Sequence, residues 1–241
     1  FGCGTEYFNY LTKAASIHNE GPYSPKFNPE KWGVDWKTVN LPHDWVVDLP
    51  YAKEASHSHG YKAVGYKFPE NSVGWYRKTI TVPQEDLGKH LYLQFDGIFR
   101  DARIWINGFY LGHEPSGYAT QVYDITEYLN YGEENLICVR ADATLEEGWF
   151  YEGAGIYRHV WLNKTAPLHV APFGTFVHST LAAPFDKAKL TIETTVENSG
   201  LQTEDYRPLH ILRDADGKEV ARCETAGKPV LPKDRQLTVG E

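Results

Sequence analysis

Apolar and polar residues alternate along much of the chain with the two-residue period of β-strands. Leu91, Leu93 and Phe95 alternate with more polar neighbours, and Ile104 and Ile106 do the same in the following segment. Because successive side chains of a strand point to opposite faces, this pattern predicts half-buried strands. Further strands are predicted at residues 75–82, 136–141, 157–163, 175–179, 189–196, 208–212 and 220–224.

Two turns between these strands are marked by residues that tolerate a positive φ. Asn107-Gly108 separates residues 104–106 from residues 109–111 and predicts a tight hairpin. The run from Asp214 to Gly217 predicts a second hairpin connection. Helical periodicity occurs only in fragments, such as a single turn at 124–129. Many short strands joined by such turns are typical of β-sandwiches, so we predict an all-β fold.

The pattern changes near Thr165, which we take as a domain boundary between residues 1–165 and 166–241. Beyond it aromatic residues become sparse and a plainer alternation begins at residue 190. The second part is shorter than the roughly 100 residues of an immunoglobulin-type sandwich, so we expect it to be truncated. In the first part, residues 19–36 and 49–69 lack alternation but are rich in Trp and Tyr. Long ordered loops of this kind are predicted to line a functional site.

Composition excludes several classes of protein. The chain has 241 residues, 14% of them aromatic and 23% charged, which is too rich in core-forming rings for a disordered chain. No run of about 18 apolar residues is present, and the net charge of -8 has no basic cluster. Neither a membrane nor nucleic acid is therefore an expected partner. Because the sequence contains no Met, we expect it to be processed, trimmed or cut from a longer protein.

The cysteines and histidines do not suggest a metal or a disulfide framework. Cys3, Cys138 and Cys223 have no CxxC or Cys/His spacing, and Cys138 lies in an apolar run that predicts a buried, inert thiol. His57 and His59 are two residues apart with no third ligand at a suitable spacing. No nucleotide-binding or hydrolase nucleophile motif occurs, so we predict neither a metal nor a cofactor.

Aromatic and carboxylate residues concentrate in the stretches 41–45, 73–77 and 146–158. A sugar presents hydroxyl groups on its rim and an apolar C–H face, so its binding site requires carboxylate acceptors and flat rings. Asp44 beside Trp45 provides these groups, as do Glu146, Glu147 and Glu152 around Trp149. Trp45 and Trp149 lie among loop-forming residues, so a packing role and a binding role both stay open for them.

Other aromatic and basic residues fit structural roles better. Trp75, Trp105 and Trp161 lie within strand patterns, which favours positions in the core or on a sheet surface. Arg77 and Arg158 are expected to tie loops to the sandwich through buried ion pairs in preference to binding a ligand.

Five motifs occur along the chain in the order 39–45, 74–78, 106–108 with 111–113, 123–126 and 153–162. In this order they resemble the N-terminal sugar-binding domain of glycoside hydrolase family 2, which contains β-galactosidases, β-glucuronidases and β-mannosidases. The resemblance covers roughly residues 36–162, and residues from 170 onward resemble the start of the family's second domain. It implies a galactose-binding-like jelly-roll β-sandwich followed by a partial immunoglobulin-like β-sandwich.

The resemblance also implies where sugar and catalysis belong. Both catalytic glutamates of the family lie in a C-terminal TIM barrel that this chain lacks, so no catalytic residue is assigned here. Asp44 is expected to accept hydrogen bonds from a terminal galactose, with a carboxylate from Glu146 or Glu147 nearby, and the choice between these two stays open. His57, His59 and Tyr61 are expected to form a neighbouring wall. The predicted substrate-binding residues are His43, Asp44, Trp45, His57, His59, Glu146, Glu147 and Trp149.

The sequence therefore favours a noncatalytic N-terminal portion of a family 2 hydrolase, inactive alone, whose parent cleaves terminal β-galactosides of oligosaccharides. The His-Asp-Trp form of the first loop favours a galactosidase within the family. The alternatives are a free-standing lectin-like module, a piece of a β-glucuronidase or β-mannosidase, and a structural sandwich at an oligomer interface. Expected partners are a terminal β-linked sugar and the protein's own barrel, and a homo-oligomer stays open. The compartment is not fixed, although the resemblance favours a periplasmic or secreted bacterial enzyme.

Overall fold

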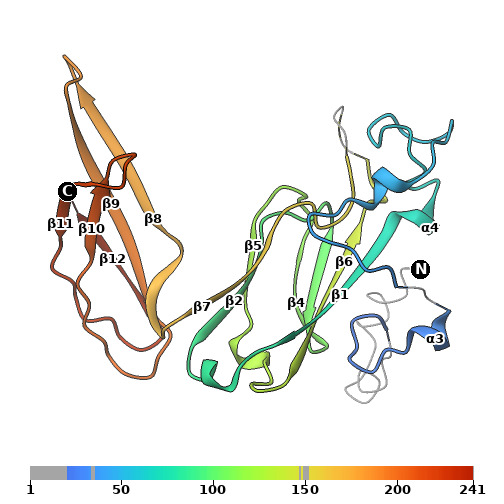
Figure 1. The fold of residues 1–241 in the computed structure, drawn as a ribbon, viewed down its shortest axis with the longest axis horizontal. Helices are drawn as coiled ribbons and strands as arrows, with labels where there is room; N and C mark the ends of the chain where they lie inside the picture. Colours follow the sequence, from blue (N-terminus) through green and yellow to red (C-terminus); the bar gives the residue numbers. More distant parts are fainter. Residues whose placement is uncertain (1–20, 34–35, 147, 149–151, 241) are drawn as a thin grey trace. The chain divides into compact units, whose positions relative to one another are not determined.

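The computed structural model describes residues 21–33, 36–146, 148 and 152–240 (Figure 1). The chain divides into two compact units. The first consists of the residues up to Leu87 together with Leu91–Asn163, and the second of Gly88–His90 together with the residues from Lys164 onward. Both units are built from antiparallel strands, so the predicted all-β class is confirmed. No helix within the described residues is long and apolar enough to cross a membrane.

The first unit is a sandwich of two sheets. One sheet has the order β1-β6-β3-β4, and the other has the order β5-β2-β7 (Figure 1). The strands are β1 (Val73–Thr81), β2 (His90–Phe95), β3 (Ala102–Ile106), β4 (Phe109–Glu114), β5 (Gln121–Asp124), β6 (Glu134–Asp142) and β7 (Val160–Thr165).

The core of this unit is formed by the alternating apolar positions that predicted the strands. Leu91, Leu93 and Phe95 of β2 are at most 1% exposed and pack in one cluster with Ile104 and Ile106 of β3. Burial of such side chains contributes about 1.5–3 kcal/mol each. The two sheets are therefore held together by the same face that the two-residue period identifies.

Both predicted hairpins and the predicted helical turn are present. Asn107 and Gly108 have φ values of 51° and 86°, and the Asn107 side-chain oxygen accepts a hydrogen bond from the Leu136 N–H at 2.8 Å. Gly217 has φ of 80° and donates its N–H to the Asp214 carbonyl at 3.0 Å. The fragment at 124–129 forms the 3-10 turn η3 (Thr126–Tyr128).

The second unit contains a three-stranded sheet of order β12-β9-β8 and a two-stranded sheet of β10 and β11. Its long hairpin has an irregularity between Val170 and Thr175, where the pairing register shifts. Its strands are β8 (Leu168–Ala182), β9 (Lys187–Asn198), β10 (Leu209–Arg213), β11 (Glu219–Glu224) and β12 (Asp234–Gly240).

Before β1, the described chain has little regular structure. It contains α3 (Pro29–Trp32), η1 (Trp45–Asp48) and α4 (Pro69–Ser72), and a further turn, η2 (Gln84–Asp86), follows β1. These short elements are linked by irregular loops, as the lack of alternation indicated.

The segment at residues 22–24 lies against the four-stranded sheet. The Tyr23 ring stacks on Trp105 with centroids 5.2 Å apart and 17° between the planes. The Arg77 guanidinium donates to the carbonyl oxygens of Pro22 and Ser24, the latter at 3.1 Å. Arg77 thus ties a loop to the sandwich as expected, here through backbone carbonyls, and no ion pair of Arg77 with another described residue is present.

Arg158 departs from the same expectation. It is exposed and donates to the backbone carbonyl of Asp96 at 3.2 Å, so it forms no buried ion pair. Trp161 lies on the sheet surface as predicted, 49% exposed, with its indole N–H donated to the Asp96 carboxylate at 2.8 Å. That hydrogen bond, together with one from Gln94, lowers the pKa of Asp96.

Cys138 provides a test of this packing. Burial raises its pKa to about 12, and its side chain is 0% exposed. Since only the thiolate is nucleophilic, we expect Cys138 in the folded chain to resist iodoacetamide at pH 8 and to react after denaturation. Peptide mass spectrometry measures both states. Equal alkylation of Cys138 in folded and unfolded samples would contradict the buried position on β6.

Candidate functional site

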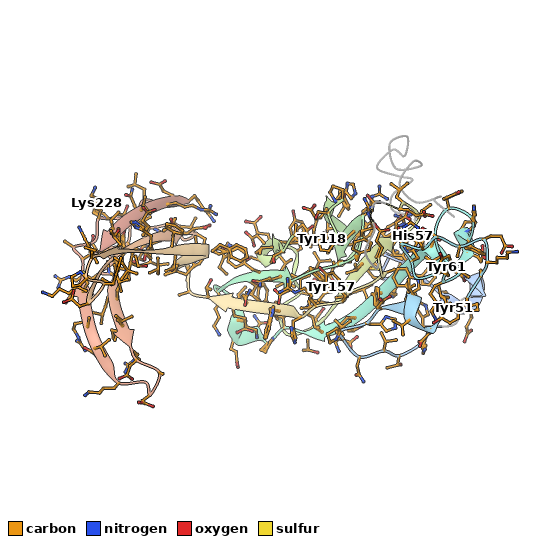
Figure 2. All side chains as sticks on the ribbon, turned by 90° about the horizontal axis from the view of Figure 1, so that it is seen from above. Tyr51, His57, Tyr61, Tyr118, Tyr157 and Lys228 are labelled. Carbon is orange, nitrogen blue, oxygen red and sulfur yellow. The ribbon has the colours of Figure 1, made fainter. Side chains whose placement is uncertain are left out.

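Three segments distant in sequence meet beside the first sandwich, and we refer to them as the loop cluster: residues 43–45, 57–65 and the described residues of 146–156. The His43 N–H donates to the Ile156 carbonyl at 2.8 Å, and the Trp45 N–H donates to the Ala154 carbonyl at 3.1 Å. The Glu152 N–H donates to the Ser58 carbonyl at 2.7 Å. These main-chain hydrogen bonds join residues 43–45 and residue 58 to residues 152–156, and all three segments of the loop cluster carry predicted site residues. Figure 2 labels two side chains of the middle segment, His57 and Tyr61.

The loop cluster has a small apolar core of its own. Val46 and Val64 are 0% and 1% exposed and pack with Ala143 and Ala154. Val64 and Ala154 belong to two segments of the loop cluster, and Val46 and Ala143 lie just outside its segments. Apolar packing therefore holds the loops together in addition to hydrogen bonds.

Asp44 is anchored in this arrangement by its own carboxylate. Its Oδ1 accepts the Val46 N–H at 2.9 Å, which caps η1, and the Ala154 N–H at 3.0 Å. Gly153 lies directly against the carboxylate, because an added Cβ there would collide with Oδ2. The carboxylate that was predicted to bind sugar hydroxyls is therefore also a structural acceptor.

His43 lies beside Tyr76 of β1. His43 Nδ1 and the Tyr76 hydroxyl are hydrogen-bonded at 2.8 Å, and the two rings meet nearly edge to face with centroids 5.7 Å apart. Burial raises the pKa of Tyr76, and the Asp44 carboxylate acts in the same direction. The Tyr76 hydroxyl therefore keeps its proton at neutral pH and fixes the orientation of the His43 ring.

Trp45 packs against the sandwich. Its indole N–H donates to the Asn71 carbonyl at 2.9 Å, and an added Cβ on Gly74 would lie 2.5 Å from its ring. The ring also contacts both the main core and the core of the loop cluster. Of the two roles left open for Trp45, these contacts support packing.

The remaining predicted residues lie in different environments. Glu146 is exposed, with Oε1 3.3 Å from the position that a Cβ on Gly65 would take. His57 is exposed, whereas His59 is 0% exposed and contacts the chain, not solvent. Glu147 and Trp149 lie outside the described residues.

The sequence indicated Glu152 as one of the carboxylates around Trp149, but it did not indicate that Glu152 is the buried partner of His59. Glu152 is only 1% exposed, and its backbone carbonyl lies 2.8 Å from His59 Nδ1. Its Oε1 accepts the Gly148 N–H at 2.9 Å, while the Ser58 hydroxyl donates to the Gly148 carbonyl. The sequence indicated only an acidic residue in a glycine-rich run, which gives no signal of burial.

The loop cluster thus brings together carboxylates and polar rings suited to hydroxyl-bearing ligands. Throughout the described parts of the chain, no group of three or more His, Cys, Asp and Glu residues is arranged to hold a metal ion.

Comparisons with known proteins agree with this chemistry. Residues 23–166 match the family model for the sugar binding domain of glycosyl hydrolases family 2. The chain is 38% identical over 210 residues to beta-galactosidase BoGH2A of Bacteroides ovatus, covering 85% of this chain and 24% of that protein. It is 37% identical over 156 residues to a putative beta-glucuronidase of Formosa agariphila, covering 64% of this chain and 14% of that protein.

Solved structures show the same fold. A glycosyl hydrolase family 2 member from Bacteroides cellulosilyticus superimposes with a TM-score of 0.80 at 29% identity, covering 92% of this chain and 28% of that one. The Bacteroides uniformis beta-glucuronidase superimposes with a TM-score of 0.73 at 22% identity, covering 96% of this chain and 26% of that one, which shows the fold alone. The chain therefore spans between 14% and 28% of the length of these relatives.

The matched residues include both the sandwich and the loop cluster. The chain belongs to glycosyl hydrolases family 2 and contains the family's sugar-binding domain.

Proposed function

We propose that the chain is the sugar-binding N-terminal portion of a larger β-galactoside hydrolase, with the loop cluster forming one wall of the pocket for the terminal sugar. The observation that carries the proposal is the anchored carboxylate of Asp44, held by two backbone N–H groups at a glycine that leaves room for it. A carboxylate fixed in this way is a preorganised acceptor for sugar hydroxyls. Hydrolysis itself requires a catalytic domain, which in this family is a barrel of roughly 250 residues.

The charges of the loop cluster favour a neutral sugar over a glucuronide. Asp44 and Glu146 both contribute carboxylates, and a like charge on the ligand would be repelled. The Lys62 amine already donates to the carbonyls of Val47 and Leu49, at 3.0 and 2.8 Å. The Lys67 amine donates to the Glu54 carbonyl at 3.1 Å. Both amines therefore already hold carbonyl oxygens of this chain.

Substrate choice tests this proposal directly. We expect the full-length parent to hydrolyse p-nitrophenyl β-galactoside with a kcat/KM at least about tenfold above that for the glucuronide, since a desolvated like-charge contact costs more than about 1.4 kcal/mol. The 241-residue chain alone should show no turnover, because it lacks the catalytic domain. A preference for the glucuronide would overturn the neutral-sugar assignment. Turnover by the repurified chain alone would place an active site within the loop cluster.

The role of Asp44 is tested by separating its charge from its structural bonds. Asp44→Asn keeps an oxygen that can accept the Val46 and Ala154 N–H groups but removes the negative charge. We expect this variant of the parent to fold normally and to lose about 10- to 100-fold in kcat/KM, the size of one hydrogen bond to a charged group. Asp44→Ala should in addition lower the free energy of unfolding by about 1 kcal/mol through loss of the cap.

The matched control is Asp48→Asn, in the same 3-10 turn. Asp48 is exposed and pairs with Lys37 on the surface at 3.3 Å, so its variant should leave both kinetics and stability unchanged. Unaltered kcat/KM for Asp44→Asn, with the parent fully folded, would remove Asp44 from the sugar site.

A further inference from the structure

His59 and Glu152 form a buried ionisable pair that joins two segments of the loop cluster. Both side chains are 0% exposed, and the residues are 93 positions apart in the sequence. Ionisable side chains are almost never fully buried unless they are paired, because removing them from water is costly. A specific arrangement must therefore stabilise these two groups.

The two ring nitrogens of His59 and the two carboxylate oxygens of Glu152 have different neighbours. A carbonyl oxygen only accepts hydrogen bonds, so His59 Nδ1 carries a proton and donates it to the Glu152 carbonyl at 2.8 Å. His59 Nε2 then faces the Glu152 carboxylate, 3.9 Å from Oε2. The other carboxylate oxygen accepts the Gly148 N–H at 2.9 Å.

Ser58 is hydrogen-bonded to both Gly148 and Glu152. Its hydroxyl donates to the Gly148 carbonyl, and its own carbonyl accepts the Glu152 N–H at 2.7 Å. Gly148 is thus held through both its N–H and its carbonyl. We call the set of Ser58, His59, Gly148 and Glu152 the clasp.

The clasp lies next to the exposed carboxylate of Glu146. A Cβ added to Gly65 would lie 3.3 Å from Glu146 Oε1 and 3.6 Å from Cδ2 of the His59 ring. Gly65 has φ of 100°, a conformation that side chains rarely adopt, so this narrow space suits glycine. Glu146 and the buried imidazole therefore both lie beside Gly65, and Glu146 is two residues before the anchored Gly148.

We propose that His59 and Glu152 are positioning residues that hold Glu146 in place for a sugar hydroxyl. The proposal rests on the function proposed above. An unanchored segment would lose conformational freedom each time a ligand bound, which weakens binding. The clasp fixes Gly148, two residues after Glu146, before the sugar binds, and its buried groups do not contact the ligand.

The experiment uses the full-length parent with two matched pairs of variants. Glu152→Gln keeps an oxygen for the Gly148 N–H, whereas Glu152→Leu removes it. His59→Asn keeps an N–H donor for the Glu152 carbonyl, whereas His59→Leu removes it. Rates on p-nitrophenyl β-galactoside are expressed per folded active site, and melting temperatures are measured beside them.

We expect Glu152→Leu and His59→Leu to lower kcat/KM about 10- to 100-fold, the effect typical of a misplaced binding group. The loss should appear mainly in KM, because Glu146 would contact the bound sugar before and during the reaction. Glu152→Gln and His59→Asn should recover most of the activity. Lower melting temperatures with unchanged kcat/KM in the leucine variants would show that the clasp only stabilises the fold and would overturn the proposal.

A double-mutant cycle separates this proposal from the function on which it rests. Glu146→Ala should lower kcat/KM in the wild-type background and have little further effect in the Glu152→Leu background. If Glu146→Ala alone leaves kcat/KM unchanged, the sugar contact of this segment is wrong. If Glu146→Ala lowers kcat/KM but its effect is the same in both backgrounds, the sugar contact stands and the positioning role is wrong.

Discussion

The loop cluster depends on the pairing of residues 43–45 with residues 154–156. Two main-chain hydrogen bonds join these segments, and the Asp44 carboxylate adds a third by accepting the Ala154 N–H. Asp44 and Ala154 are 110 positions apart, so their pairing closes a long loop. The conformational entropy lost by closing this loop is offset by the packing of the folded sandwich. The other contacts of the cluster, including the small apolar core and the clasp, are possible because this pairing brings both segments to one place.

Close packing explains the glycines of the run from Gly153 to Gly155. At Gly155, φ is 127° and an added Cβ would lie 2.6 Å from the His43 carbonyl and collide with the Tyr76 hydroxyl. At Gly153 it would collide with the Asp44 carboxylate. Both glycines allow the chain to approach the residues that form the proposed sugar wall. The motif that revealed the family therefore reflects the packing of the site as well as its chemistry.

The sequence was sufficient for the elements whose side chains alternate, and it failed where local pattern is weak. Residues 91–95 and 104–106 showed a clear period of two, and Asn107-Gly108 defined its hairpin. The four-residue strand β5 and the strand β12 were not predicted, because short or mostly polar segments become strands only through pairing with a neighbour. Within the site, motifs indicated Asp44, but the burial of His59 arises from a residue 93 positions away. Such a contact has no signature in local sequence.

The acidic residues of the loop cluster differ in their exposure and in the hydrogen bonds that they accept from the chain. Both Glu152 side-chain oxygens face groups inside the cluster, whereas Glu146 is exposed and Asp44 uses one oxygen for two backbone N–H groups. Placing several carboxylates together is unfavourable unless some are compensated by donors of the chain. Backbone N–H groups provide this compensation for Asp44 Oδ1 and Glu152 Oε1. In the proposed function, the inner acid, Glu152, holds the loop, and Asp44 and Glu146 contact the ligand.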